Sequence, residues 1–83
     1  GARRRAGAEA DPAVLDALKA WRSAMAQASG VPAHVIFHDA TLAAVAEARP
    51  TTRAELLALP GLGPVKAERY GDTLLAVLAG VGA

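Results

Sequence analysis

The stretch LPGLGPVKAERYG, residues 59–71, combines a glycine-rich turn with two cations, Lys66 and Arg69. Gly61 and Gly63 flank a single leucine, and glycine permits the positive φ angles of a sharp turn. A helix is predicted to begin directly afterwards, at Pro64. The first amides of such a helix have no partner within the helix and lie at the positive end of its dipole. The chemistry that this stretch offers is the binding of an anion such as a phosphate.

The same glycines also fit a purely structural role. Leu62 is predicted to insert between the two helices that the turn joins, and that packing alone would require a tight bend. The residue pattern leaves both interpretations open: a phosphate contact through backbone amides, or a turn that serves only the fold.

Metal chemistry and catalysis find little support in this chain. His34 and His38 are four residues apart, but protein zinc sites use at least three ligands and the chain has no cysteine. We interpret both as structural or surface histidines. There is no pair of carboxylates at a useful spacing and no nucleophile with a base, and a small bundle offers no deep cleft. The sequence predicts no catalytic residue, no metal, no cofactor and no enzymatic activity.

Composition predicts one folded domain. Hydrophobic residues make up 53% of the 83 residues and charged ones 20%, which is too apolar for a disordered chain. No apolar run approaches the roughly 18 residues of a membrane span, and the N-terminus lacks the apolar core of a signal peptide. We therefore expect a cytoplasmic protein without membrane association.

The charges divide into a basic tail and a nearly neutral domain. Residues 1–10 carry Arg3, Arg4 and Arg5 and are predicted to be a tail or interdomain linker, and residues 81–83 a short second tail. The rest of the chain carries six basic against seven acidic residues, a net charge of −1. A dedicated nucleic-acid-binding domain usually has a clear positive excess, so this balance argues against strong DNA binding by the domain at 11–80.

Hydrophobic periodicity predicts the first helix. It begins after Asp11 as N-cap, has Pro12 in its first turn and ends at Gly30. One apolar stripe is predicted from residues spaced four and three apart: Val14, Leu18, Trp21, Met25 and Ala28. At that spacing we interpret Trp21 as a core residue and not as a platform for base stacking.

The remaining elements are short. Residues 31–38 are predicted to be an extended or single-turn connector that places Phe37 in the core, and residues 39–49 a helix with Leu42, Val45 and Ala46 inward. Thr52 and Glu55 match a capping box for a helix at 53–58.

A last helix is predicted to run from Pro64 to Gly80. Gly71 lies in its middle, at a cost of about 1 kcal/mol relative to alanine, which indicates close packing of another helix. Its inward face is predicted to comprise Ala67, Tyr70, Leu74, Val77 and Leu78. The fold class is all-α, a small bundle of four to five short helices with no β-sheet.

Two resemblances follow from these motifs. The residues LPGLGPVKA resemble a helix-hairpin-helix motif, whose glycine turn binds a DNA phosphate through backbone amides. Residues 13–79 resemble the helicase and RNase D C-terminal (HRDC) domain. The features that carry this longer resemblance include Leu18, Arg22, Val31-Pro32, Phe37, Asp39-Ala40-Thr41-Leu42, Pro50-Thr51, Glu55-Leu56-Leu57, Gly61-Leu62-Gly63, Lys66 and Tyr70-Gly71.

The HRDC resemblance implies an accessory module of a RecQ-type or UvrD-like DNA helicase in DNA repair or recombination. It implies weak binding, without sequence specificity, to single-stranded or branched DNA, together with contacts to other domains of the helicase, in a monomeric domain located at the nucleoid. The residues to which it assigns DNA binding are Lys19, Arg22, Arg53, Gly61, Gly63, Lys66 and Arg69. The alternative is a structural or protein-contact domain with little or no DNA affinity.

Overall fold

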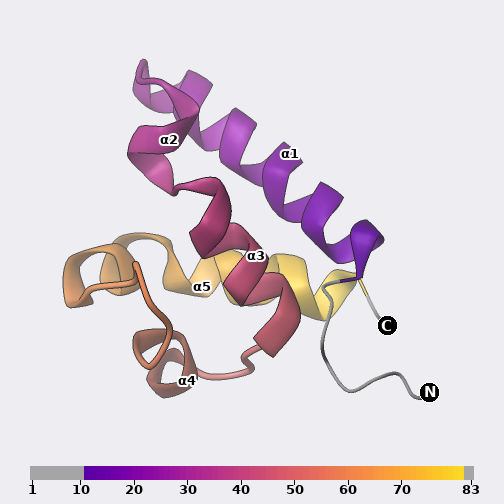
Figure 1. The fold of residues 1–83 in the computed structure, drawn as a ribbon. Coiled ribbons are helices and arrows are strands. Elements are labelled where there is room, and N and C mark those ends of the chain that lie inside the picture. The colour runs from indigo at the N-terminus through magenta and orange to yellow at the C-terminus, as the bar shows by residue number, and fades with distance from the viewer. Residues whose placement is uncertain (1–10, 82–83) are drawn as a thin grey trace.

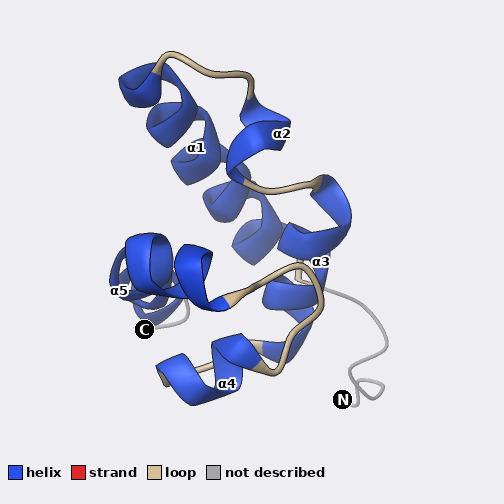
Figure 2. Ribbon diagram, turned by 90° about the vertical axis from the view of Figure 1, so that its left-hand side faces the viewer, coloured by secondary structure: helices blue, strands red, loops and turns tan. Residues whose placement is uncertain are grey.

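Five helices and no strand make up residues 11–81, the part of the chain that the computed structural model describes. The predicted tail or linker at residues 1–10 and the last two residues of the predicted second tail lie outside this part. The helices are α1 (Pro12–Ser29), α2 (Ala33–Ile36), α3 (Asp39–Ala48), α4 (Arg53–Leu57) and α5 (Pro64–Gly80). α3 lies between α1 and α4 (Figures 1 and 2), while α5 packs against both α1 and α4. The predicted all-α class is confirmed.

The ends of α1 form as predicted. The Asp11 carboxylate accepts a hydrogen bond from the Ala13 amide at 2.9 Å, and Gly30 takes the left-handed conformation at φ 70°. The predicted apolar stripe is wrong at Ala28, which is exposed, whereas Ala26 is buried. Both alanines lie about 80° around the helix from Leu18, on opposite sides. Ala26 is the buried one because it lies on the side of α1 against which α2 folds back.

The connector contains a single helical turn, followed by two extended residues, Phe37 and His38. α2 ends at Ile36, and Phe37 is extended at φ −153° with its side chain in the core at 1% exposure. Leu42, Val45 and Ala46 of α3 are buried, as predicted. The largest fully buried side chains come from α1, α3, α4, α5 and this connector: Phe37, Leu18, Ile36, Leu42, Leu56, Leu74, Val14 and Val45.

The start of α4 differs in one detail from a standard capping box. Thr52 Oγ1 accepts from the Glu55 amide at 3.2 Å, as predicted. The Glu55 carboxylate instead accepts from the amide of Thr51, one residue further out, at 2.7 Å. α4 ends at Leu57 with Ala58 as its C-cap, one residue earlier than predicted.

Only one of the two turn glycines needs to be glycine. Gly61 has φ 84°, and a Cβ there would collide with the side chain of Thr41 in α3. Gly63 is extended at φ −87°, and a Cβ there would meet nothing within 4 Å. Leu62 between them is 5% exposed, so it inserts as predicted. The loop from α4 to α5 accordingly runs past α3 (Figure 2).

Gly71 is buried where α5 meets α4. A Cβ at this position would lie 3.6 Å from Leu56 Cδ1 and 3.8 Å from Arg53 Cγ, which is ordinary van der Waals contact. The predicted close helix packing is therefore present, yet it leaves room for one methyl group.

Candidate nucleic-acid interface

Three aromatic side chains join α1, the connector and α5. The ring centroids of Trp21 and Phe37 are 5.9 Å apart, those of Trp21 and Tyr70 5.9 Å, and those of Phe37 and Tyr70 5.6 Å. Separations and tilts of this kind are typical of attractive aromatic pairs. Trp21 is thus half-buried against the core, and this cluster fixes the connector against the first turns of α5.

Lys66 extends over this aromatic cluster. Its Nζ lies 5.1 Å from the centroid of the Phe37 ring, within the range of a cation–π contact. Arg69 follows one turn later on α5 and is exposed, as is Lys19 on α1. None of these three cations takes part in an ion pair with another residue that the structure describes.

The N-terminus of α5 carries excess positive charge. Its N-cap is Gly63, which has no side chain to accept from the first amides, and its first turn contains no acidic residue. Lys66 in that turn adds to the positive end of the helix dipole, where a cation is unfavourable for the helix itself. Within the described residues, the amides of Val65 and Lys66 have no acceptor. This end of the helix is a suitable environment for an anion.

Arg22 has a structural role inside the fold. Its side chain is 12% exposed, donates to the Phe37 carbonyl at 2.9 Å and lies 2.7 Å from Asp39 Oδ1. The hydrogen bond and the charge of Arg22 hold the pKa of Asp39 below its ordinary value, with smaller contributions from Lys19 and His38. The guanidinium that the family resemblance assigned to DNA is therefore occupied by the connector and α3.

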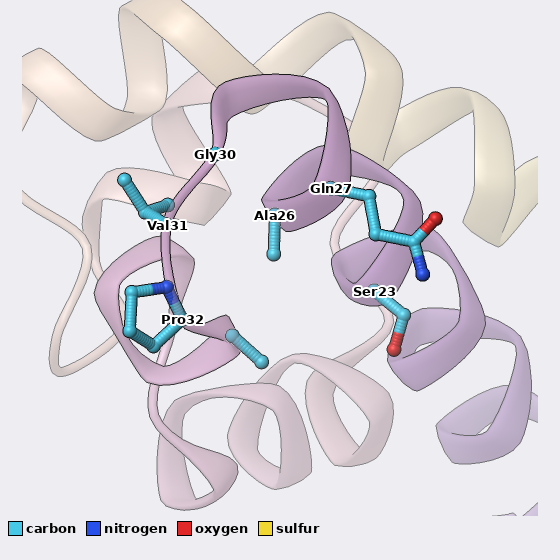
Figure 3. A pocket seen from close by; sticks show the side chains of 7 residues that line it. Ser23, Ala26, Gln27, Gly30, Val31 and Pro32 are labelled. Atoms are coloured by element: carbon cyan, nitrogen blue, oxygen red, sulfur yellow. The ribbon is translucent and has the colours of Figure 1, made fainter.

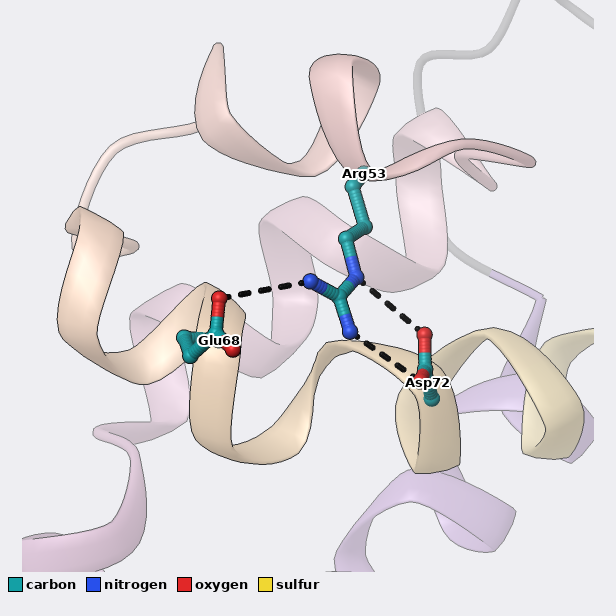
Figure 4. A network of polar contacts seen from close by, with 3 residues as sticks. All are labelled: Arg53, Glu68 and Asp72. Carbon is teal, nitrogen blue, oxygen red and sulfur yellow. Dashed lines mark hydrogen bonds and ion pairs between the residues drawn. The ribbon is translucent and has the colours of Figure 1, made fainter.

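Arg53 is likewise engaged, in a network that joins α4 to α5 (Figure 4). Its guanidinium lies 3.0 Å from Asp72 Oδ2, donates from Nε to Oδ1 at 3.2 Å, and reaches Glu68 at 3.4 Å. The hydrogen bond with Asp72 and the charges of Asp72 and Glu68 raise the pKa of Arg53. Arg53 thus neutralises two carboxylates on the helix that carries Lys66 and Arg69.

The connector and the glycine turn share one face of the molecule. Phe37 contacts Lys66, and Thr41 four residues later contacts Gly61, so the segment between them runs alongside the turn. Lys19 lies close enough to Asp39 to lower the pKa of that carboxyl. We call this surface the connector face: it comprises residues 34–41, the turn at 61–66, Lys19 and Arg69.

A hollow elsewhere on the surface lacks the chemistry of a nucleic-acid site. It measures about 400 Å³ and lies where α1 ends and α2 begins (Figure 3). It is lined by uncharged residues only: Ser23, Ala26, Gln27, Gly30, Val31, Pro32 and Ala33.

Residues 11–81 contain neither a candidate metal cluster nor a candidate membrane-spanning helix. No cluster of three or more metal-ligating side chains occurs there. No helix in that range has both the length and the apolar character needed to cross a membrane.

Comparison with known proteins shows which family this chain resembles in sequence and fold. The profile of the HRDC domain matches residues 11–78. The chain is 45% identical over 73 residues to the ATP-dependent DNA helicase UvrD2 of Mycobacterium tuberculosis, and 36% identical over 71 residues to the ATP-dependent DNA helicase RecQ of Pasteurella multocida. These alignments cover 88% and 86% of the chain, but it spans only about a tenth of the length of either relative.

A solved structure has the same fold. HRDC domain 3 of D. radiodurans RecQ superimposes with a TM-score of 0.81 at 38% identity, over 83% of this chain and 91% of that one.

Proposed function

The chain belongs to the HRDC domain family, and on that premise we propose that it is a non-catalytic accessory module of a DNA helicase in repair or recombination. In this role it binds the DNA backbone weakly and without sequence specificity. The substrate is single-stranded or branched DNA at the nucleoid, and the module contacts it while other domains of the helicase perform the catalysis.

The observation that carries this proposal is the gathering of unpaired cations beside unpaired amides on the connector face. Lys19, Lys66 and Arg69 supply the positive charge, and the amides of Val65 and Lys66 supply backbone donors. Such contacts go to phosphates and carry no sequence information. Arg22 and Arg53 are not part of the proposed interface, because their guanidinium groups bind carboxylates of this chain.

The strength of binding follows from the number of cations. Three side chains neutralise at most about three phosphates, and each contributes ~0.7 to the salt dependence on a single strand. The dissociation constant should then be about 10⁻⁴ M at physiological salt, the weak end of non-specific binding. A tethered helicase compensates for this weakness, because it raises the local concentration of the module at the DNA.

A second function, contact with another domain of the helicase, has its own support. Val65 in the first turn of α5 is 73% exposed, and Val35 and Leu57 are each about half exposed at 48% and 47%. Exposed apolar side chains mark a protein contact where they form a contiguous patch, and these three are the large ones exposed in residues 11–81. The net charge of −1 in the domain agrees with this alternative.

Fluorescence anisotropy with a labelled single-stranded oligonucleotide tests the proposal. We expect the double variant Lys66→Gln/Arg69→Gln to lose most of the binding at low salt. Arg49→Gln is the matched control, since Arg49 is an exposed cation at the far end of α3, about 15 Å of helix from Asp39. Equal loss in the double variant and the control would show a non-specific charge effect and overturn the proposed face. Unchanged binding in the double variant would overturn it as well.

A further inference from the structure

The only two histidines of the chain lie side by side on the connector face. The rings of His34 and His38 are stacked with centroids 6.1 Å apart and an angle of 26° between their planes. Both side chains are exposed. His38 belongs to the segment between Phe37, which contacts Lys66, and Thr41, which contacts Gly61, and this segment runs alongside the turn that offers its amides to an anion.

Charged residues of three helices lie around the segment that carries the pair. Lys19 and Arg22 belong to α1, Asp39 begins α3, and Lys66 lies over Phe37 from α5. The one carboxylate among them, Asp39, is bound by Arg22 at 2.7 Å. Asp39 also interacts with His38, but its charge is already balanced by Arg22, so positive charge added to either ring increases the potential of the connector face.

We propose that protonation of His34 and His38 strengthens DNA binding at the connector face, so that the domain binds the DNA backbone more tightly as the pH falls from about 7.5 to 5.5. This inference rests on the proposed function and adds a regulation to it. Histidine is the side chain whose charge changes between about pH 5 and 8. Two cations would join Lys19, Lys66 and Arg69, which raises the number of positive side chains on this face from three to five.

The two rings lie close together, with their centroids 6.1 Å apart. A phosphate beside the pair is attracted more strongly to protonated rings than to neutral ones. Binding of DNA and uptake of protons should therefore favour one another, by the reciprocity of linked equilibria.

The test is the binding of an oligo-dT strand at pH 7.5 and 5.5, in wild type and in His34→Gln/His38→Gln. Thymine has no basic site that protonates in this range, and a rhodamine label keeps the signal independent of pH. EDTA excludes a metal ion held by the two rings. The variant retains every other titratable group, including the terminal amine, so the difference between the proteins isolates the histidines. Melting curves at both pH values verify that the variant is folded.

We expect the affinity of the wild type to rise on the order of tenfold or more from pH 7.5 to 5.5 at low salt. The slope of log K against log salt should steepen by about 1.4, which is ~0.7 for each added cation. The variant should show neither change. An equal pH response in both proteins, or none in a wild type that binds at pH 7.5, would overturn this inference and leave the proposed function standing. No binding at either pH would overturn both.

Discussion

Nη1 of Arg22 lies 2.7 Å from Asp39 Oδ1 and also donates to the carbonyl of Phe37 at 2.9 Å. One guanidinium on α1 thereby holds the segment at which the connector passes into α3. The Phe37 ring in turn contacts Lys66 of α5, whose Nζ lies 5.1 Å from the ring centroid. The fold of the connector and the shape of the candidate interface thus depend on the same contacts.

Removal of this guanidinium should destabilise the domain. In Arg22→Met the side chain retains its apolar length but leaves the Phe37 carbonyl and Asp39 without their donor. A lost hydrogen bond to a charged group costs about 1.5–3 kcal/mol, which corresponds to a fall in Tm on the order of 10 °C in a domain of this size. Thermal melts measure it. Lys19→Met, on an exposed position one turn earlier, is the control and should melt like the wild type; equal melting of both variants would contradict the structural role of Arg22.

Stability should decrease in acid because two carboxyl groups have lowered pKa values. The Arg22 hydrogen bond and charge lower the pKa of Asp39, and hydrogen bonds from Thr51 lower that of Glu55, from ordinary values of 3.8 and 4.5. A group with a lowered pKa in the folded state stabilises the fold above its unfolded value and loses that contribution as the pH falls further. Unfolding free energy should thus be constant above about pH 5 and decrease below about 4.5. Asp39→Asn/Glu55→Gln should flatten this dependence, and an unchanged dependence would contradict the assignment.

The two turn glycines should respond differently to alanine. Gly61→Ala places a Cβ at φ 84° and against Thr41, so we expect a loss on the order of 2 kcal/mol. Gly63→Ala, the control, has an ordinary extended backbone and open space, and should change stability by less than about 0.5 kcal/mol. Urea unfolding compares them. In a Thr41→Ala background, Gly61→Ala should recover only part of its loss, because the backbone strain remains.

Gly71 should accept a methyl group but not a branched side chain. Gly71→Ala meets Leu56 and Arg53 at ordinary contact distances and gains helix propensity, so we expect stabilisation of about 1 kcal/mol. Gly71→Val extends beyond that space and should cost about 1–3 kcal/mol by overpacking. Thermal melts of the two variants should shift in opposite directions. A stable valine variant would show that α4 yields at this contact.

Local signals predicted most of the fold. The limits of α1 could be predicted because its capping residues, Asp11, Pro12 and Gly30, act on the backbone within one helical turn. The spacing of the apolar residues in α3 identified its buried face. The choice between Ala26 and Ala28 could not be predicted, because it depends on the side to which α2 folds back. Pro64 favours the extended backbone of the preceding Gly63, but nothing in the turn sequence shows that Gly61 packs against Thr41, twenty residues earlier.

The candidate site was harder to predict because its electrostatics depend on contacts that are distant in sequence. Arg22 and Asp39 are seventeen residues apart, and Arg53 and Asp72 nineteen. The family resemblance placed both arginines among the DNA-binding candidates, and only the fold shows that carboxylates of the same chain bind them. The lysines and Arg69 remain candidates because no such partner reaches them within residues 11–81.

The salt dependence of binding to single-stranded DNA tests the central claim most directly. If Lys19, Lys66 and Arg69 neutralise phosphates, the slope of log K against log salt should be about −2 at pH 7.5. The slope should become less steep by ~0.7 for each of the three cations replaced by glutamine, and it should remain unchanged in Arg49→Gln. Absence of binding at ~20 mM salt, where the Debye length is roughly 20 Å, would contradict the claim and favour the protein-contact function. So would a slope that the three substitutions leave unchanged.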